Sequence, residues 1–283
     1  MRDIKWRYYL DLLLCSRKIL MLHLCHLYKT HHMRKSIFVI CFFYFFAPSF
    51  SQIKPNERLV YAASYNMSGL MTQLAQVTME TETMKTSKSD FLHLSCQAAT
   101  FSKWDSFFKI RDLYESYVNP VTLKPSLYKR SINEGGYTKT EKYVFKGDGK
   151  TIMSTAKKRN KSETKNTFTV GGGTQDIVSI LYKVRTVDFE HFKIGQTKSF
   201  VIVFDEKEIP VSVKYMGKES VSAGNLGTKT CYKISISANT NKLKGKDKNL
   251  IWLTADAKKI PTLIKFSIPV GTGQLTLSSA TGI

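Results

Sequence analysis

The sequence predicts a mainly β protein: a long, curved antiparallel sheet of the half-barrel or barrel-like type, with one short helix packed against it. Three observations lead to this prediction. After about residue 55, apolar and polar side chains alternate with a period of two over most of the chain. β-branched and aromatic residues dominate the alternating segments. Turn residues separate these segments about every 10 to 15 residues.

The first 51 residues are interpreted as sequence that precedes the folded protein. Residues 33–51 have the parts of a secretory signal peptide: two basic residues, the apolar run Ile37–Phe46, and small residues before a cleavage between Ser51 and Gln52. The apolar run is about half as long as a membrane span, which favours cleavage over an anchor. Residues 1–32 are apolar but interrupted by charges, and a start codon assigned too early explains them. A genuine N-terminal anchor is the rival interpretation.

The mature chain, residues 52–283, is expected to form a single β-rich domain with two strand sets. The first set covers about residues 55–165. Its clearest strands are Glu57–Tyr65, Gln73–Glu82 and Asp90–Thr100. The segment Gly135–Thr155 is predicted to form a hairpin with Gly147–Gly149 at the turn. Ser102 is expected to cap a short helical turn that runs to Phe108, with a strand after it.

A helix is predicted near residues 175–186, between the two strand sets. Four apolar residues follow the spacing i, i+3, i+4, i+7: Ile177, Ile180, Leu181 and Val184. Thr174 or Asp176 is the expected N-cap, and Arg185 lies near the C-terminus, where a cation is favoured. Three glycines precede this helix, but they match no phosphate-binding motif, so no nucleotide cofactor is predicted.

The second strand set covers about residues 195–283 and continues the meander. The segment Ser199–Gly217 is expected to form two strands with a turn at Asp205–Lys207. The remaining predicted strand segments are Gly227–Ala238, Asn249–Ile268 with a turn at Asp256–Lys259, and Gly273–Gly282. A long sheet of this kind is expected to curl and to close, or half close, because exposed strand edges invite unwanted pairing.

The charge balance constrains the partners. The chain has 43 Lys/Arg and 22 Asp/Glu, for a net charge of +21. Without the eight basic and two acidic residues of positions 1–51, 35 − 20 leaves +15. Basic proteins often bind nucleic acid, but export argues against that partner and favours anionic lipid or polysaccharide, and a solvated basic surface is the simplest interpretation. The basic runs Lys157–Lys165 and Lys242–Lys248 are expected to be exposed loops.

The stretch Phe107–Pro125 is the most informative for a binding site, because it mixes charges with aromatic residues. Burying such charges is costly unless they are paired. They form either a polar cluster at the rim of an apolar pocket or an internal Arg–Asp pair that fixes strand register. The candidate ligand-binding residues, from this stretch, its surroundings and the helix, are Trp104, Phe108, Arg111, Asp112, Tyr114, Glu115, Asp176, Tyr182 and Arg185.

No catalytic residue, metal site or cofactor is assigned from the sequence. His93 and His191, the only histidines of the mature chain, have no metal-binding spacing, and no serine nucleophile motif is present. Cys96 and Cys231 have two interpretations in an oxidising compartment: a disulfide that closes a long loop, or two separate buried thiols. Separate thiols are the favoured interpretation.

Several motifs together resemble the domain-of-unknown-function family 3108, exported proteins of Gram-negative bacteria. They include "FFKIRDLYESYVNPVTLKP", "QDIVSILYKVRTVDFEHFKIGQ", "GTKTCYKI" and "IWLTADAKKIPTLIKFSIPVGTGQLTLSSATG", and the resemblance covers nearly all of the mature chain. It implies secretion and a mostly antiparallel β domain, but it implies no reaction. By looser analogy, the predicted fold is similar to the lipid-facing half-barrels of lipoprotein carriers.

The leading hypothesis is a non-enzymatic periplasmic or otherwise exported protein that carries an apolar or amphiphilic, lipid-like ligand. One alternative is a hydrolase or transferase for envelope polymers that uses Asp112, Glu115 or Asp176. Another is a scaffold that binds outer-membrane partners through a strand edge. A lipid or another envelope component is the expected partner, with at most peripheral membrane association. The sequence leaves the oligomeric state open.

Overall fold

The computed structural model describes residues 53–283 except 68, 88, 239–248 and 269–270. The chain divides into two compact units, residues 1–49 and 50–283, and the described residues all belong to the second. The predicted signal peptide, its cleavage site and the basic run Lys242–Lys248 lie outside the described residues. Among those described, no helix is long and apolar enough to cross a bilayer.

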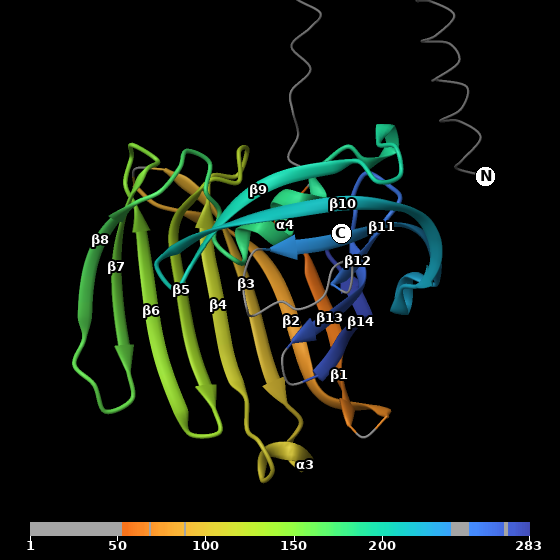
Figure 1. Ribbon diagram of the computed structural model, residues 1–283, viewed down its shortest axis with the longest axis horizontal. Coiled ribbons are helices and arrows are strands. Elements are labelled where there is room, and N and C mark those ends of the chain that lie inside the picture. Colours follow the sequence, from red (N-terminus) through yellow and green to blue (C-terminus); the bar gives the residue numbers. More distant parts are fainter. Residues whose placement is uncertain (1–52, 68, 88, 239–248, 269–270) are drawn as a thin grey trace, which may run out of the picture. The chain divides into compact units, whose positions relative to one another are not determined.

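The described residues form one sheet of 14 strands and a few short helices (Figure 1). The N-terminal strands are β1 (Arg58–Met67), β2 (Leu70–Lys85), β3 (Asp90–Thr100), β4 (Arg111–Val118), β5 (Pro125–Glu134), β6 (Tyr137–Phe145), β7 (Thr151–Lys158) and β8 (Thr164–Thr169). The C-terminal strands are β9 (Thr197–Phe204), β10 (Lys207–Ser222), β11 (Thr228–Ala238), β12 (Leu250–Thr254), β13 (Pro261–Ile268) and β14 (Gly271–Thr281). The helices are α3 (Ser102–Asp105), α4 (Ser179–Arg185) and the 3₁₀ turns η3 (Phe189–His191) and η4 (Gly224–Leu226).

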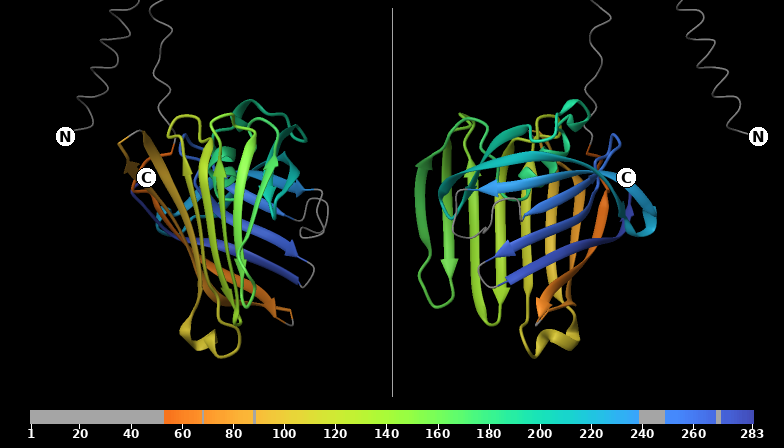
Figure 2. Two further views of the ribbon diagram at one scale, coloured as in Figure 1. Left: turned by 90° about the vertical axis from the view of Figure 1, so that its left-hand side faces the viewer. Right: turned by 45° about the vertical axis from the view of Figure 1, so that its right-hand side comes forward.

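The sheet is built from two meanders that meet where the first strand pairs with the last. The strand order is β8-β7-β6-β5-β4-β3-β2-β1-β14-β13-β12-β11-β10-β9, and neighbouring strands are antiparallel. Strands β8 and β9 are therefore the two edges, and the sheet does not close by strand pairing. It curls so that α4 lies against its concave face (Figures 1 and 2). The predicted fold class is confirmed.

Helix α4 begins later than predicted. Residues 175–178 are not helical, because Gln175 pairs with strand β9: its N–H donates to Val201 O at 2.9 Å, and its carbonyl accepts from Val203 N at 2.8 Å. The Asp176 carboxylate then accepts hydrogen bonds from Val178 N and Ser179 N, both at 2.8 Å. These bonds satisfy N–H groups that a helix start leaves without partners, although the N-cap residue itself is Val178 and not the predicted Thr174 or Asp176.

The predicted strands and turns are present. The structure adds strands in segments whose sequence lacks a clear alternation of apolar and polar side chains. Two strands, β5 and β8, were not among the predicted ones. In β5 the charged Arg130 faces inward, which interrupts the apolar pattern. Strand β8 is an edge strand with mostly exposed side chains. The run Lys157–Lys165, expected to be a loop, is a loop only at residues 159–163, because β7 and β8 extend into it.

Candidate functional site

An apolar cavity lies between helix α4 and the concave face of the C-terminal half of the sheet. Its volume is about 320 Å³. Its walls carry no titratable side chain; the lining residues are Met79, Ile177, Ile180, Leu181, Val184, Ile202, Phe204, Ile209, Val211, Val213, Ile236, Ala238, Ile251, Leu253, Pro261 and Ile264.

The walls of the apolar cavity follow from the two periodicities of the sequence. The predicted apolar stripe of the helix, Ile177 to Val184, faces the cavity. On β10, the alternate residues Ile209, Val211 and Val213 point to the same side and form the facing wall. Part of this surface belongs to a core cluster in which Val213, Tyr215 and Ile234 are buried.

A polar cavity of about 710 Å³ lies next to the apolar one, and Phe204 lines both. The polar cavity is formed by the inner faces of β4 to β8 and by the turn between β9 and β10; its lining residues are Tyr114, Arg130, Ile132, Glu134, Tyr137, Lys139, Glu141, Ala156, Lys158, Thr164, Phe204, Asp205, Glu206 and Lys207. The Arg130 guanidinium stacks on the Phe204 ring, 4.6 Å from its centroid. One aromatic ring thus separates an apolar compartment from a charged one.

The turn between β9 and β10 consists of Asp205 and Glu206, and both residues have positive φ angles, 47° and 60°. Two consecutive positive φ angles are typical of a type I′ hairpin turn, which usually contains Asn or Gly. Two non-glycine residues are costly in this conformation unless their surroundings hold them. Here both side chains are held, by residues on strands β5 to β8.

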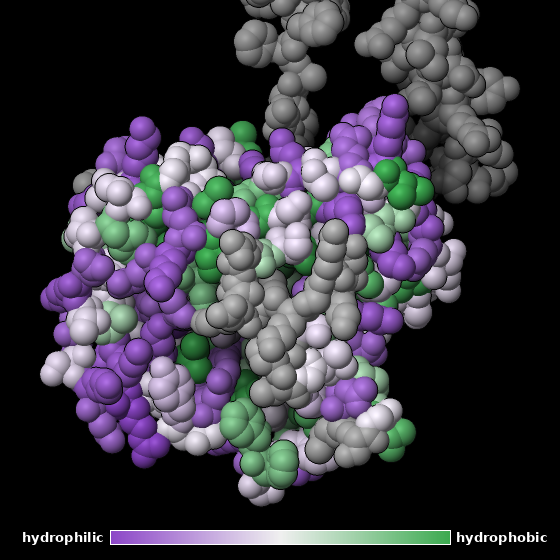
Figure 3. Space-filling model, viewed as in Figure 1, coloured by the Kyte–Doolittle hydropathy of each residue, from purple (hydrophilic) through white to green (hydrophobic). Residues whose placement is uncertain are grey.

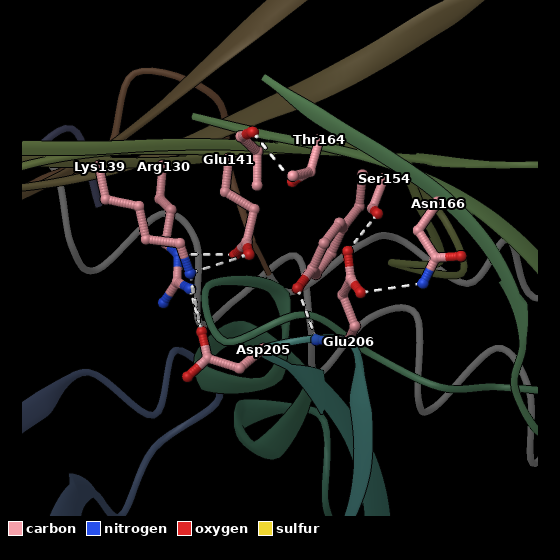
Figure 4. Close-up of polar contacts among 10 residues, drawn as sticks. Arg130, Lys139, Glu141, Ser154, Thr164, Asn166, Asp205 and Glu206 are labelled. Carbon is pink, nitrogen blue, oxygen red and sulfur yellow. Dashed lines mark hydrogen bonds and ion pairs between the residues drawn. The ribbon is translucent and has the colours of Figure 1, made fainter. Parts of the chain in front are cut away.

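We call Asp205 and Glu206, with their contacts, the polar latch (Figure 4). The Asp205 carboxylate accepts hydrogen bonds from Arg130 and, at 3.0 Å, from Lys139. Other latch contacts come from strands β6 to β8: Ser154 Oγ donates to the Glu206 carboxylate, Asn166 Nδ2 donates to it at 3.0 Å, and Glu206 N donates to Tyr143 Oη at 2.9 Å. The latch therefore joins the β9–β10 hairpin to the other end of the sheet without strand pairing.

Two further ion pairs compensate the buried charges next to the latch. The Glu141 carboxylate lies 2.7 Å from Arg130 Nε and 3.1 Å from Lys139 Nζ. Both Arg130 and Glu141 side chains are 3% exposed. Burial alone would lower the pKa of Arg130, but the nearby negative charges, led by Glu141, raise it overall. Hydrogen bonds from Ser154 and Asn166 lower the pKa of Glu206.

Glu134 lines the polar cavity and has the buried Asp112 beside it. Burial, together with the hydrogen bond and negative charge of Asp112, raises the pKa of Glu134 to about 7. Asp112 is buried and accepts a hydrogen bond from Asn133 N at 2.9 Å.

Three of the predicted candidates, Trp104, Phe108 and Arg111, lie at one end of the sheet, outside both cavities. Trp104 belongs to α3 and its indole N–H donates to Gln73 O at 3.1 Å. Phe108 is exposed. Arg111 forms an ion pair with Asp105 at 2.6 Å. The internal Arg–Asp pair considered from the sequence is not formed, because Arg111 pairs with Asp105 of α3, outside Phe107–Pro125, and this pair is partly exposed.

The next three candidates lie on opposite faces of strand β4. Asp112 and Tyr114 point to the concave face, where Tyr114 lines the polar cavity. Glu115 points to the other face, where it accepts from His93 Nε2 at 3.0 Å and Tyr117 Oη at 3.2 Å. Side chains alternate between the two faces of a strand, so Asp112 and Glu115, three positions apart, point to opposite faces and their carboxylates do not converge.

The candidates around the helix are buried structural groups. Asp176 is fully buried and bound by Ser116 Oγ and by backbone N–H groups at the start of α4. The Tyr182 side chain is also buried. Arg185 is 1% exposed and donates to both oxygens of Glu57 at 2.7 Å. None of the three lines either cavity, so the structure does not support their predicted ligand contacts.

Cys96 on β3 and Cys231 on β11 are free thiols. The disulfide considered from the sequence is not formed, and the favoured interpretation of two separate thiols agrees with the structure. Burial raises the pKa of Cys96 to about 12, which leaves it an unreactive thiol at neutral pH. Cys231 is buried beside Thr262, with Sγ 3.4 Å from Oγ1.

Sequence reasoning missed the charged residues of the polar cavity. Arg130, Lys139 and Glu141 lie on β5 and β6 and were not among the sequence candidates. Asp205 and Glu206 were recognised only as part of a turn. One signal was available: a two-residue turn of Asp-Glu lacks the usual glycine or asparagine, and such a turn needs partners for its side chains.

The fold and its two cavities define a class of protein: a curled, incompletely closed antiparallel sheet with an apolar compartment beneath a helix. The chain belongs to the family described as "Protein of unknown function (DUF3108)", whose model matches residues 60–278. No curated protein matches the chain.

Two solved structures show the relation of the fold to known ones. The chain is similar to a β-barrel-like protein of domain of unknown function DUF1849 from Brucella abortus, with 10% identity and a TM-score of 0.53, covering 80% of this chain and 97% of that one. A structure described as "a putative lipoprotein from Parabacteroides distasonis" aligns with 9% identity and a TM-score of 0.31, covering 81% and 96%. At such identities, the first likeness shows the barrel-like fold alone.

Proposed function

We propose that this protein is an exported, non-enzymatic carrier that binds the apolar part of an amphiphilic ligand in the cavity beneath helix α4. The observation that carries the proposal is the lining of that cavity: about 320 Å³ of space bounded by aliphatic side chains, Phe204 and Pro261, with no titratable side chain. Ligand pockets of proteins begin at about 300 Å³ and are mostly apolar. An apolar cavity of this size excludes water and favours an apolar guest.

The adjacent polar cavity explains why the ligand is amphiphilic rather than purely apolar. Phe204 borders both compartments, and Arg130 stacks on its polar side. If the apolar chain of a ligand lies against Ile180 and Val211, its head group can extend past the Phe204 ring into the polar cavity. Hydrophobic burial supplies the affinity in this arrangement, and the polar compartment accepts the head group.

The signal-like stretch before Gln52 supports export. A carrier in the cell envelope would meet lipids and lipid-linked molecules, which have the required amphiphilic chemistry.

The test is native mass spectrometry of protein purified from the compartment to which it is exported, combined with displacement of a fluorescent fatty acid. We expect a bound mass that organic extraction removes, and saturable displacement by long-chain amphiphiles. Protein with no bound mass and no saturable binding would refute the carrier function.

A matched pair of variants connects binding to the cavity. Val211 lines the cavity but is not part of either buried core cluster, so Val211→Phe fills the space with little disturbance of the core. Val221→Phe makes the same change on the same strand outside the cavity. We expect Val211→Phe to weaken binding at least about tenfold, because the guest and the ring need the same volume, and Val221→Phe to bind as the parent does.

A second function, hydrolysis or transfer on an envelope polymer, is favoured by one observation only. Glu134 lines the polar cavity and has a pKa near 7, as a general acid at neutral pH requires. Loss of a turnover by Glu134→Gln, in protein that still melts as the parent does, would establish this function. The originally considered set Asp112, Glu115 and Asp176 does not line one pocket.

A further inference from the structure

Exposed apolar side chains gather at one end of the sheet, around helix α3. Of the nine large apolar residues exposed in the described part of the chain, five lie at the turns of this end, and we call them the apolar rim: Leu70, Met71, Phe107, Phe108 and Tyr137. Phe107 is 77% exposed and Leu70 is 74% exposed. Green patches over α3 and the β1–β2 turn mark this end in Figure 3. A group of exposed apolar residues at neighbouring turns indicates an interaction surface.

The apolar rim is held together by hydrogen bonds between separate turns. Trp104 Nε1 donates to Gln73 O at 3.1 Å, and this bond ties α3 to strand β2 beside Met71. Gly135 N donates to Lys109 O at 2.9 Å, which ties the β3–β4 connection to the β5–β6 turn.

A close contact adds to these bonds. The Phe108 ring lies so close to Gly135 that a Cβ there would be 2.7 Å from its edge. The Phe107 ring is therefore presented by a supported turn and not by a loose loop.

Cations surround the apolar rim. The four turns at this end cover residues 68–69, 101–110, 135–136 and 159–163, and they contain four basic residues, Lys103, Lys109, Arg159 and Lys161. Their two acidic residues are already paired: Asp105 with Arg111 at 2.6 Å, and Glu163 with Lys165 at 3.5 Å. The turns thus present uncompensated positive charge around exposed aromatic rings.

We propose that the apolar rim is a docking surface for an anionic lipid bilayer, with Phe107 and Leu70 entering the interface and the four turn cations contacting lipid head groups. Aromatic and aliphatic side chains flanked by Lys and Arg have the chemistry of peripheral membrane anchors. A second copy of this chain fits less well, because two rims facing each other would bring like charges together. No residue of the rim lines the apolar cavity, and Tyr137 alone lines the polar cavity assigned to the ligand head group, so Phe107, Phe108, Leu70 and Met71 can be tested apart from the proposed ligand site.

The experiment is cosedimentation of the exported protein with vesicles of phosphatidylcholine alone, and with vesicles in which roughly a third of the lipid is phosphatidylglycerol. We expect binding to the anionic vesicles that weakens as salt is added. The Phe107→Ser/Phe108→Ser variant should lower the partition coefficient about tenfold or more, since insertion is lost. The Lys103→Glu/Lys109→Glu variant should remove the preference for anionic lipid.

The matched controls are Val121→Ser and Ile194→Ser, at exposed apolar positions that do not belong to the rim, 67% and 76% exposed. They should bind vesicles as the parent does. Equal binding of neutral and anionic vesicles, or equal loss in the rim and control variants, would overturn the proposal. So would a dimer in light scattering that Phe107→Ser/Phe108→Ser converts to a monomer, because a second copy would then cover the rim. Circular dichroism verifies that each variant is folded.

Discussion

The buried ion pair of Glu57 and Arg185 allows a sharp test of how the fold is held together. Arg185 is the last residue of α4, and Glu57 directly precedes β1, so the pair joins the helix to the sheet. Both side chains are almost fully buried, and the guanidinium meets the carboxylate through two bonds of 2.7 Å. Arg185 also donates to Lys258 O, at 3.0 Å from Nη2. We predict that Glu57→Gln strongly destabilises the protein.

The magnitude follows from the burial of the charge that remains. Removing one partner of a buried ion pair leaves an uncompensated charge and costs about 3–5 kcal/mol. In a domain of this size, each kcal/mol lowers the melting temperature by about 2–4 °C. Glu57→Gln should therefore lower it by about 6–20 °C. Replacing both residues together, as Glu57→Leu/Arg185→Met, should recover most of this loss, since no charge then stays buried.

Thermal unfolding followed by circular dichroism measures these shifts. The control lies one residue away: Arg58 and Glu80 form an ion pair at 2.8 Å, but their side chains are 48% and 50% exposed. Glu80→Gln should cost less than about 1 kcal/mol. If Glu57→Gln and Glu80→Gln shift the melting temperature equally, the reasoning is refuted. If Glu57→Gln leaves stability unchanged but weakens ligand binding, Arg185 has the ligand-binding role predicted from the sequence.

Three further predictions concern other sites. The pKa of Glu134 is higher in the folded protein than in the unfolded chain, so the free energy of unfolding should fall as pH rises from about 4.5 to about 7. Denaturant titrations at several pH values would measure this fall, and Glu134→Gln should remove it. Asp205→Asn should cost about 1–3 kcal/mol, because Arg130 keeps only its other acidic partner, and urea unfolding would measure this loss. Cys96 and Cys231 should resist iodoacetamide in the native protein and react after unfolding, as peptide mass spectrometry would show; a disulfide-linked peptide would contradict the structure.

The fold class could be predicted because it depends on local patterns. Alternating side chains on β3 and β10, and the stripe of α4, each predict which face is apolar. The apolar face of β3 lies in one core cluster, and that of β10, with Ile180 and Val184 of α4, lies in a second one. The order of strands in the sheet could not be predicted in this way. The pairing of β1 with β14 joins residues more than 200 positions apart, such as Arg58 and Thr281, and no local pattern encodes it.

The candidate site was predicted only in part, for a physical reason. The apolar residues of α4 were identified from their spacing, and they do line the cavity. The charged candidates were chosen because they lie among aromatic residues, but only Tyr114 of the nine candidates lines the polar cavity. Whether a charge such as Arg185 meets a ligand or a buried partner depends on which distant residue folds against it, here Glu57.

The polar latch shows how this sheet manages its two edges. A long β-sheet that stays open has unpaired edge strands, and barrels remove them by pairing the first edge with the last. Here the edges are β8 and β9. Part of β9 is covered instead by the segment that contains Gln175, which bonds to Val201 and Val203.

Side-chain contacts of Asp205 and Glu206 then bind the β9–β10 hairpin to strands β5 to β8. A closure made by side chains contains fewer hydrogen bonds than a closure made by strand pairing, because it lacks the row of backbone hydrogen bonds. It also places Phe204, the residue that borders both cavities, directly beside the closure. A sheet that needed only stability would gain more from pairing β8 with β9. The latch is thus a closure by side chains, without strand pairing, at the border of the apolar cavity.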